Sequence, residues 1–261
     1  METKQTANRK PTHLFLASLG KTRLRPGGKE ATERILDACQ LSSDCKVLEV
    51  APNMGTTAIH IATTYGCHVT GIDLHPPSVK IAQENIKKHG LEHLIHIQNG
   101  NALQLPFEDE SFDVVINEAM LSMLPHEQKQ KAILEYYRVL KPGGRLVTHD
   151  LLLRKDADDP AIQIRLQELR KLLAVNAQPM TEKGWRLLFD RVSFQEVHHQ
   201  TGKMTLLSLK GLLVDEGWDG LMTILSNAMK APDDQQYLFE LIRTFDDSDD
   251  LYGHITFTAI K

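Results

Sequence analysis

The chain has 261 residues, 41% of them hydrophobic and 25% charged, an ordinary composition for a folded globular protein. Its net charge of −4 and pI near 6.3 argue against a general nucleic-acid or membrane-surface binder, since such proteins present a basic face. The three cysteines, Cys39, Cys45 and Cys67, lack the spacing of a zinc site or a disulfide framework. We therefore expect a cytoplasmic protein without a metal site and without a nucleic-acid or membrane partner, either a monomer or a homodimer. The polar start (METKQTANRK) and the short apolar stretch Leu14 to Leu19 do not fit a secretion signal.

Short apolar runs separated by helical patterns dominate the first 150 residues. The runs predict strands at Lys46–Val50, His68–Asp73, Ile95–Gln98, Phe112–Asn117 and Arg145–His149. The segments between them predict helices at Thr56–Tyr65, at Ser78–His89 with Ser78 as N-cap, and at Lys131–Leu140, ended by Lys141-Pro142-Gly143-Gly144. This alternation is typical of an α/β fold, a Rossmann-like, doubly wound sheet that binds ligands beyond the carboxyl ends of its strands.

A different pattern follows residue 150. Helices are predicted at Pro160–Val175, at Glu182–Asp190, and over most of residues 206–246 with breaks at Gly217–Gly220 and Pro232. Strands near Gln195–Gln200 and at Tyr252–Ile260 bring the expected sheet to seven strands, mainly parallel, with helices on both faces and added helices covering the site. The acidic loop Asp246–Asp250 lacks the glycine and terminal glutamate of a calcium loop, so we interpret it as a solvated turn.

The turn after the first predicted strand, VLEVAPNMG, stands where α/β enzymes bind nucleotides. A dinucleotide turn G-x-G-x-x-G would place glycines at positions 51, 53 and 56, where this chain has Ala51, Asn53 and Thr56. Pro52 stiffens the turn and favours an extended Ala51, whereas Asn53 tolerates a left-handed backbone. These replacements keep a tight turn, and bulky or charged residues are absent from it. We therefore predict a functional ligand turn that does not bind nicotinamide.

Four stretches in this order carry a resemblance to a known family: VLEVAPNMG, GIDLHPPSVKIAQENIKKHGL, IQNGNALQLPFEDESFDVVINEAMLSML and YRVLKPGGRLVTHDLLL. Together they resemble the class I S-adenosylmethionine-dependent methyltransferases that act on small molecules. The resemblance covers roughly residues 25 to 150 well and the last strands loosely. It implies one methyltransferase domain over residues 1–261. Within it we expect an N-terminal helical segment at 1–40, a cofactor-binding core at 45–151, and an acceptor-side region at 152–261 with a helical insert at about 204–250.

The resemblance also implies which residues contact S-adenosylmethionine. Asp73 can accept hydrogen bonds from the ribose hydroxyls, and Asn101 stands where the family commonly has an acid that contacts adenine. Glu118 is expected near the methionine portion or the sulfonium. The full expected set is Gly28, Glu49, Ala51, Asn53, Gly55, Asp73, Leu74, Asn101, Ala102 and Glu118. Structural alternatives remain for four of them: a surface acid at Asp73, a turn residue at Asn101, a helix-start acid at Glu118, and a plain loop at Gly28.

Methyl transfer from a sulfonium is an in-line displacement that needs a base only when the acceptor must lose a proton early. His149 and Asp150 are the candidate catalytic residues at the crevice mouth, with a strand-end histidine and a capping acid as structural alternatives. Four large side chains after residue 150 either line the acceptor pocket or form helix core: Trp185, Trp218, Met222 and Met229. The expected activity is methyl transfer from S-adenosylmethionine to an N, O or S atom of a small molecule. The alternative is a regulatory protein that binds S-adenosylmethionine without methyl transfer.

Overall fold

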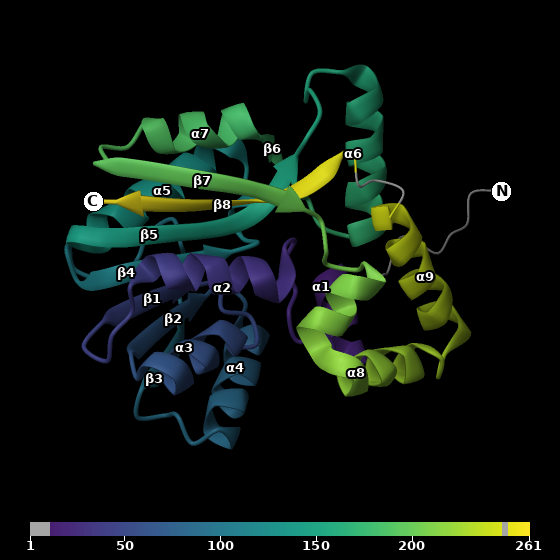
Figure 1. Ribbon diagram of the computed structural model, residues 1–261, viewed down its shortest axis with the longest axis horizontal. Coiled ribbons are helices and arrows are strands. Elements are labelled where there is room, and N and C mark those ends of the chain that lie inside the picture. The colour runs from purple at the N-terminus through teal and green to yellow at the C-terminus, as the bar shows by residue number, and fades with distance from the viewer. Residues whose placement is uncertain (1–10, 247–249) are drawn as a thin grey trace.

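The computed structural model describes residues 11–246 and 250–261 (Figure 1). The polar first ten residues and positions 247–249 of the acidic loop lie outside the described residues. An eight-stranded sheet has the order β3-β2-β1-β4-β5-β8-β7, with β6 paired to β5. The strands are β1 (Lys46–Val50), β2 (His68–Asp73), β3 (Ile95–Asn99), β4 (Phe112–Glu118), β5 (Leu140–Leu153), β6 (Met180–Thr181), β7 (Glu196–Lys203) and β8 (Tyr252–Ile260).

The sheet is parallel from β3 to β5, whereas β8 runs antiparallel to both β5 and β7. The predicted doubly wound, mainly parallel fold is confirmed. The count of seven strands was wrong by one, because β6 spans only two residues and leaves no hydrophobic pattern. The central strands β1 and β4 are buried along nearly their whole length, as expected where helices cover both faces of a sheet.

Helices on each face of the sheet form separate cores. On one face pack α2 (Gly28–Cys39), α3 (Thr56–Tyr65) and α4 (Pro76–Lys88). The other face is covered by α5 (His126–Val139) and α7 (Glu182–Asp190), where Trp185 is fully buried. Alternate residues of β1 enter the two cores, Val47 on the first face and Leu48 on the second.

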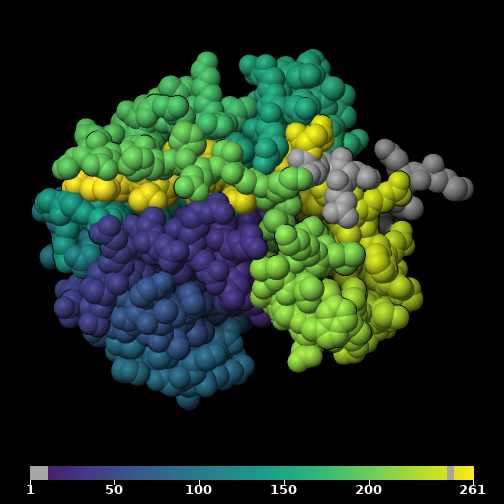
Figure 2. All heavy atoms as spheres, viewed as in Figure 1, coloured from purple at the N-terminus to yellow at the C-terminus, as the bar shows by residue number. Residues whose placement is uncertain are grey.

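Four further helices form a separate apolar cluster, which we call the helical cap (Figure 1). The cap consists of α1 (Thr12–Leu19), α6 (Pro160–Leu173), α8 (Leu209–Ala228) and α9 (Pro232–Asp246). Within it α1 packs on α6 and α8, while α8 also contacts α2 of the core, so that the cap and the core form adjoining masses in Figure 2. The predicted interruption of α8 is confirmed at Gly217, whose φ of 70° and ψ of −178° are not helical.

Several predicted boundaries were wrong, among them the start of α5, which begins at His126 and not at Lys131. The helix α4 begins at Pro76, not at Ser78, and its N-cap is His75; prolines suit the first turn of a helix because their missing N–H groups have no helical partner there. The segment Lys141–Gly144 does not connect a helix to a later strand but lies inside β5. Gly143 has a φ of 76°, and the pairing of β4 with β5 is irregular between Phe112 and Val114, so these glycines accommodate a local irregularity in the strand.

Candidate functional site

A cavity of about 520 Å³ lies between the carboxyl ends of β1, β2 and β4 and the helical cap. Its volume is in the range of small-molecule binding sites. One side of the lining, the polar half, contains Arg25, Glu49, Ala51, Asn53, Asp73 and Glu118. The other side, the apolar half, contains Leu16, Leu151, Leu173, Met204, Leu206 and Phe245.

The turn from Val47 to Gly55 forms part of the polar half. Ala51, Asn53 and Gly55 all have left-handed backbones, with φ of 59°, 51° and 75°. The expectation for Asn53 is confirmed, but the extended geometry predicted for Ala51 was wrong. Ala51 donates its N–H to the carbonyl of Ile72 at 2.8 Å, which continues the pairing of β1 with β2 while the chain begins to reverse. The turn therefore carries the backbone shape that glycines would adopt more easily.

Asp73, at the end of β2, is fixed by two backbone amides. Its Oδ2 accepts the N–H of Asn53 at 3.2 Å, and its Oδ1 accepts the N–H of His75 at 2.9 Å. The left-handed Asn53 thus connects the turn to the acid that faces the cavity. Each carboxylate oxygen has a further lone pair, so Asp73 can still accept hydrogen bonds from a pair of hydroxyl groups.

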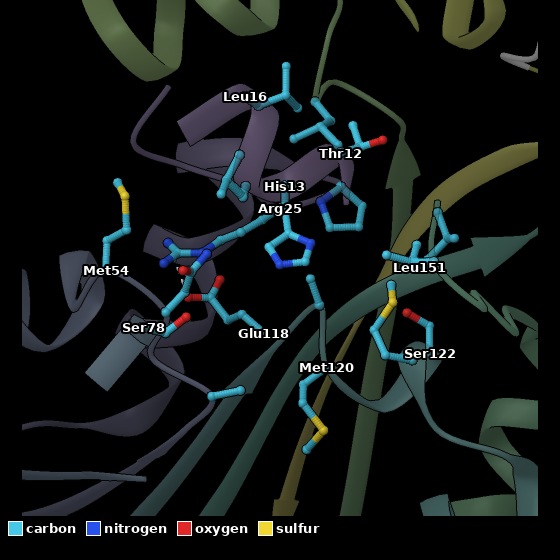
Figure 3. A pocket seen from close by; sticks show the side chains of 18 of the residues that line it. Thr12, His13, Leu16, Arg25, Met54, Ser78, Glu118, Met120, Ser122 and Leu151 are labelled. Atoms are coloured by element: carbon cyan, nitrogen blue, oxygen red, sulfur yellow. Dashed lines mark ion pairs between the residues drawn. The ribbon is translucent and has the colours of Figure 1, made fainter. Parts of the chain in front are cut away.

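Arg25 and Glu118 form a buried ion pair on the cavity wall, 3.2 Å between Nη1 and Oε1 (Figure 3). Glu118 also accepts hydrogen bonds from the hydroxyls of Thr32 at 2.6 Å and Thr57 at 3.0 Å. Burial by itself raises the pKa of Glu118, but the Arg25 charge and these hydrogen bonds, with one from His149, lower it to about 2. The carboxylate is therefore ionised and fully engaged with the chain.

Glu49, the other buried acid of the polar half, has an unused oxygen. Its Oε2 is buried and has no hydrogen-bond partner among the described residues. Burial raises the pKa of Glu49 to about 7; Arg25 opposes this shift and the nearby Glu118 adds to it. A buried oxygen without a partner is costly, so this position favours a ligand that brings a hydrogen-bond donor, above all a positively charged one.

Five of the expected cofactor residues do not line the cavity: Gly28, Gly55, Leu74, Asn101 and Ala102. Gly55 is the N-cap of α3, and its φ of 75° explains why a glycine stands there. The amide oxygen of Asn101 accepts the N–H of Leu103 at 2.9 Å, as a turn-forming asparagine does. The Leu74 side chain is 69% exposed, outside the enclosed space.

A residue far away in the chain explains why a glycine stands at position 28. A side chain there would collide with the Asp215 carboxylate, which accepts the N–H of Lys29 at 2.7 Å. The start of α2 therefore does bind a carboxylate, as its free amides favour, but that carboxylate belongs to α8 of the cap. Asp215 also pairs with the fully buried Lys21 at 2.9 Å, which fixes the segment before α2 against the cap.

His149 and Asp150 do not stand at the crevice mouth, because both are fully buried in β5 and neither lines the cavity. His149 Nε2 accepts the N–H of Gly27 at 3.0 Å, so its proton resides on Nδ1, which donates to Glu118 at 3.0 Å. Asp150 accepts the N–H groups of Ser122 and Leu151. Burial raises the pKa of Asp150, and the hydrogen bonds from Ser122 oppose this shift. Both side chains hold neighbouring segments in place.

The sequence reasoning missed His13, which reaches into the cavity from α1 (Figure 3). Burial, then the neighbouring His75, lower the pKa of His13, while Asp73 acts in the opposite direction. No motif surrounds His13, so no sequence signal pointed to it.

Both interpretations of Trp218, Met222 and Met229 were wrong, since all three are more than half exposed and lie outside the cavity.

A cavity at the carboxyl ends of parallel strands, with a tight turn after the first strand and an acid after the second, defines a nucleotide-binding α/β protein. Comparison with known proteins narrows this class. A family described as "Methyltransferase domain" matches residues 47–144. The chain is 52% identical over 90% of its length to a Haemophilus influenzae protein of uncharacterized function, covering 92% of it. It is also 28% identical to Methyltransferase GfsG of Streptomyces halstedii, over 91% of this chain and 82% of that protein.

Solved structures show the same fold. The MccD protein aligns with a TM-score of 0.72 at 18% identity, over 92% of this chain and all of its own. Phosphoethanolamine N-methyltransferase 2 of Haemonchus contortus, solved with S-adenosyl-L-methionine, aligns with a TM-score of 0.77 at 18% identity, over 95% of this chain and 56% of its own. Residues 47–144 thus form a methyltransferase domain, and the chain has the fold of the class I S-adenosylmethionine-dependent methyltransferases. It is thus an enzyme with S-adenosylmethionine as cofactor, and nothing supports the regulatory alternative.

Proposed function

We propose that the chain methylates a small-molecule acceptor that binds beside S-adenosylmethionine in the cavity under the helical cap. The observation that carries this proposal is the continuity of the polar and apolar halves within one cavity. Two relatives that match part of the chain bear names that specify small molecules, demethylmenaquinone methyltransferase and phosphoethanolamine N-methyltransferase. We treat residues 1–261 as a single methyltransferase domain.

The polar half suits each portion of the cofactor. We assign the ribose hydroxyls to Asp73, whose carboxylate is fixed by two amides and still has acceptor capacity. We assign the ammonium of the methionine portion to the unpartnered oxygen of Glu49 and its carboxylate to Arg25. Ala51 and Asn53 bring the backbone close to the ligand. When bound, S-adenosylmethionine supplies an activated methyl carbon, so the chain mainly has to align the acceptor and exclude water.

We further propose that His13, not His149 or Asp150, takes the proton from an acceptor that must lose one. His13 lines the cavity, and its lowered pKa favours the neutral imidazole that can accept a proton, whereas the other two are buried and engaged. His13→Gln should lower kcat at least about a hundredfold for a hydroxyl acceptor and leave affinity for S-adenosylhomocysteine unchanged. The matched control, His198→Gln on exposed β7, should retain full activity. Full activity of His13→Gln would contradict this assignment.

Three observations bear on cellular location and partners. Within residues 11–246 and 250–261, no helix combines the length and apolar character needed to cross a membrane. The cysteines are unpaired, Cys39 and Cys67 being buried and Cys45 partly so. Together with the slightly acidic pI of about 6.3, this favours a cytoplasmic enzyme without a nucleic-acid partner.

Calorimetric titration with S-adenosylmethionine and S-adenosylhomocysteine, followed by a methyl-transfer assay over a broad acceptor panel, tests the proposed function. We expect saturable binding of both ligands and turnover with at least one small-molecule acceptor. Absence of binding to folded protein at millimolar ligand would contradict the cofactor assignment. Binding without turnover over the whole panel would contradict the proposed activity and favour the regulatory alternative.

A further inference from the structure

The apolar half of the cavity specifies the kind of acceptor, and we propose that this acceptor is an uncharged, mainly apolar molecule. The inference rests on the proposed function, since it concerns the acceptor side of the same cavity. The side chains concerned are Leu16, Leu151, Leu173, Met204, Leu206 and Phe245. Leu151 lies in β5, and the other five belong to the helical cap or to the segment between β7 and α8.

Charge is confined to the other half. The Asp, Glu, Lys and Arg side chains that line the cavity, within the part of the chain that the structure describes, are Arg25, Glu49, Asp73 and Glu118. They all lie in the polar half. An anionic acceptor such as a phosphate monoester needs a guanidinium or ammonium group of its own, but Arg25, the one Arg or Lys among the described lining residues, is paired with Glu118 and assigned to the cofactor carboxylate. A charged acceptor in the apolar half would therefore lose its hydration without gaining a partner.

The polar side chains that line the cavity outside the polar half include Thr12, Ser122 and Asn176, none of which carries a charge. The hydroxyl of Thr12 lies 2.6 Å from the hydroxyl of Tyr237, which donates in turn to the carbonyl of Leu172 at 2.6 Å. Phe245 is the only aromatic side chain among the described lining residues that carries no ring nitrogen, so no aromatic cage for a quaternary ammonium surrounds this space. His13 lies at the boundary with the polar half. This arrangement suits an acceptor with an apolar body and a single polar atom directed toward the polar half.

A size-matched probe series tests the inference on protein saturated with S-adenosylhomocysteine. The probes are 2-naphthol, 2-naphthyl phosphate and 2-naphthylmethylammonium, with phosphoethanolamine and glycine as small charged compounds, and binding is measured by calorimetry. We expect 2-naphthol to bind at least tenfold more tightly than each charged probe. Equal or tighter binding of a charged probe, or no binding of 2-naphthol at millimolar concentration, would overturn the inference.

A pair of variants tests whether the apolar half of the cavity binds 2-naphthol. Leu206→Asp places a carboxylate in the apolar half and should weaken 2-naphthol binding at least tenfold while S-adenosylhomocysteine binding is retained. The control Leu209→Asp, 63% exposed at the start of α8 and outside the cavity, should change neither. Unchanged 2-naphthol binding by Leu206→Asp would show that the probe sits elsewhere. Failure of the proposed function would be recognised separately, as loss of S-adenosylhomocysteine binding by the unmodified protein.

Discussion

Asp73 in the polar half is held by backbone amides of turns close to it in the chain, whereas the apolar half is assembled from side chains far apart in the chain. In the polar half, Asp73 is held by amides of the two turns that flank β1 and β2. In the apolar half, Leu16 of α1 meets Leu151 of β5 and Phe245 of α9 in one cluster. The backbone of the turns thus shapes the wall around Asp73, while the packing of the cap shapes the apolar half.

The largest expected effect is on the ion pair that joins the segment before α2 to the polar half. The side chains of Arg25 and Glu118 are only 10% and 5% exposed, so Arg25→Met would leave a buried carboxylate without its counter-charge. We expect the free energy of unfolding to fall by about 3 kcal/mol. Urea denaturation measures the change. The double variant Arg25→Met with Glu118→Gln should recover part of the loss, and an equally unstable double variant would show that the charge is not the cause.

The next effect concerns the cofactor alone. Asp73→Ala should weaken S-adenosylhomocysteine binding at least tenfold, about 1.4 kcal/mol, because the acceptor of the ribose hydroxyls is removed. Binding of 2-naphthol to the variant, measured at saturating S-adenosylhomocysteine, should change little if the two halves act separately. The exposed Asp44→Ala serves as control for a lost surface charge. Unchanged cofactor affinity in Asp73→Ala would show that the polar half is misassigned.

A pH dependence should follow from Glu49. In the free protein its pKa of about 7 lies above the ordinary value of 4.5, so the carboxyl is largely protonated at pH 6. The cofactor ammonium requires the carboxylate form, and binding should therefore release a proton and tighten as pH rises through 7, by up to about tenfold between pH 6 and pH 8. Without cofactor, the pH dependence of the folding stability has the opposite sign. The folded state retains the proton that the unfolded state loses, so the free energy of unfolding falls as the pH rises from 4.5 to 7.

Calorimetry in two buffers of different ionisation enthalpy measures the proton released on cofactor binding. Glu49→Gln carries a neutral side chain of the same shape and should bind with an affinity that no longer varies in this pH range. If the pH dependence persists in Glu49→Gln, it arises from another group that faces the cavity, such as His13.

The smallest effect concerns the turn. Ala51 has a φ of 59°, where an L-residue costs about 1 kcal/mol more than glycine does. Ala51→Gly relieves this cost but makes the unfolded chain more flexible, so we expect a net gain of about 0.5 kcal/mol in the free energy of unfolding. The control Ala161→Gly, in the helical backbone of α6, should instead lose stability. A loss in both variants would indicate that Ala51 is not strained.

The sequence by itself determined the sheet, the left-handed Asn53 and the location of Asp73 beside the cavity. These features depend on hydrophobic runs and on turn chemistry within a few residues, which a linear pattern records. It misjudged features that distant residues control. His149 and Asp150 are buried because β8, more than 100 residues later, pairs along β5. Gly28 faces Asp215 of α8 rather than the ligand.

The apolar half and the presence of His13 in the cavity lining could not be predicted from the sequence. Leu16, Leu206 and Phe245 have no local motif, and any apolar residue at a buried helix position would give the same sequence pattern. Packing brings them together, since α1, α6, α8 and α9 must each bury an apolar face and the end of the sheet supplies the surface. Part of the polar half can thus be predicted from the sequence, while the apolar half forms only when the cap packs against the sheet.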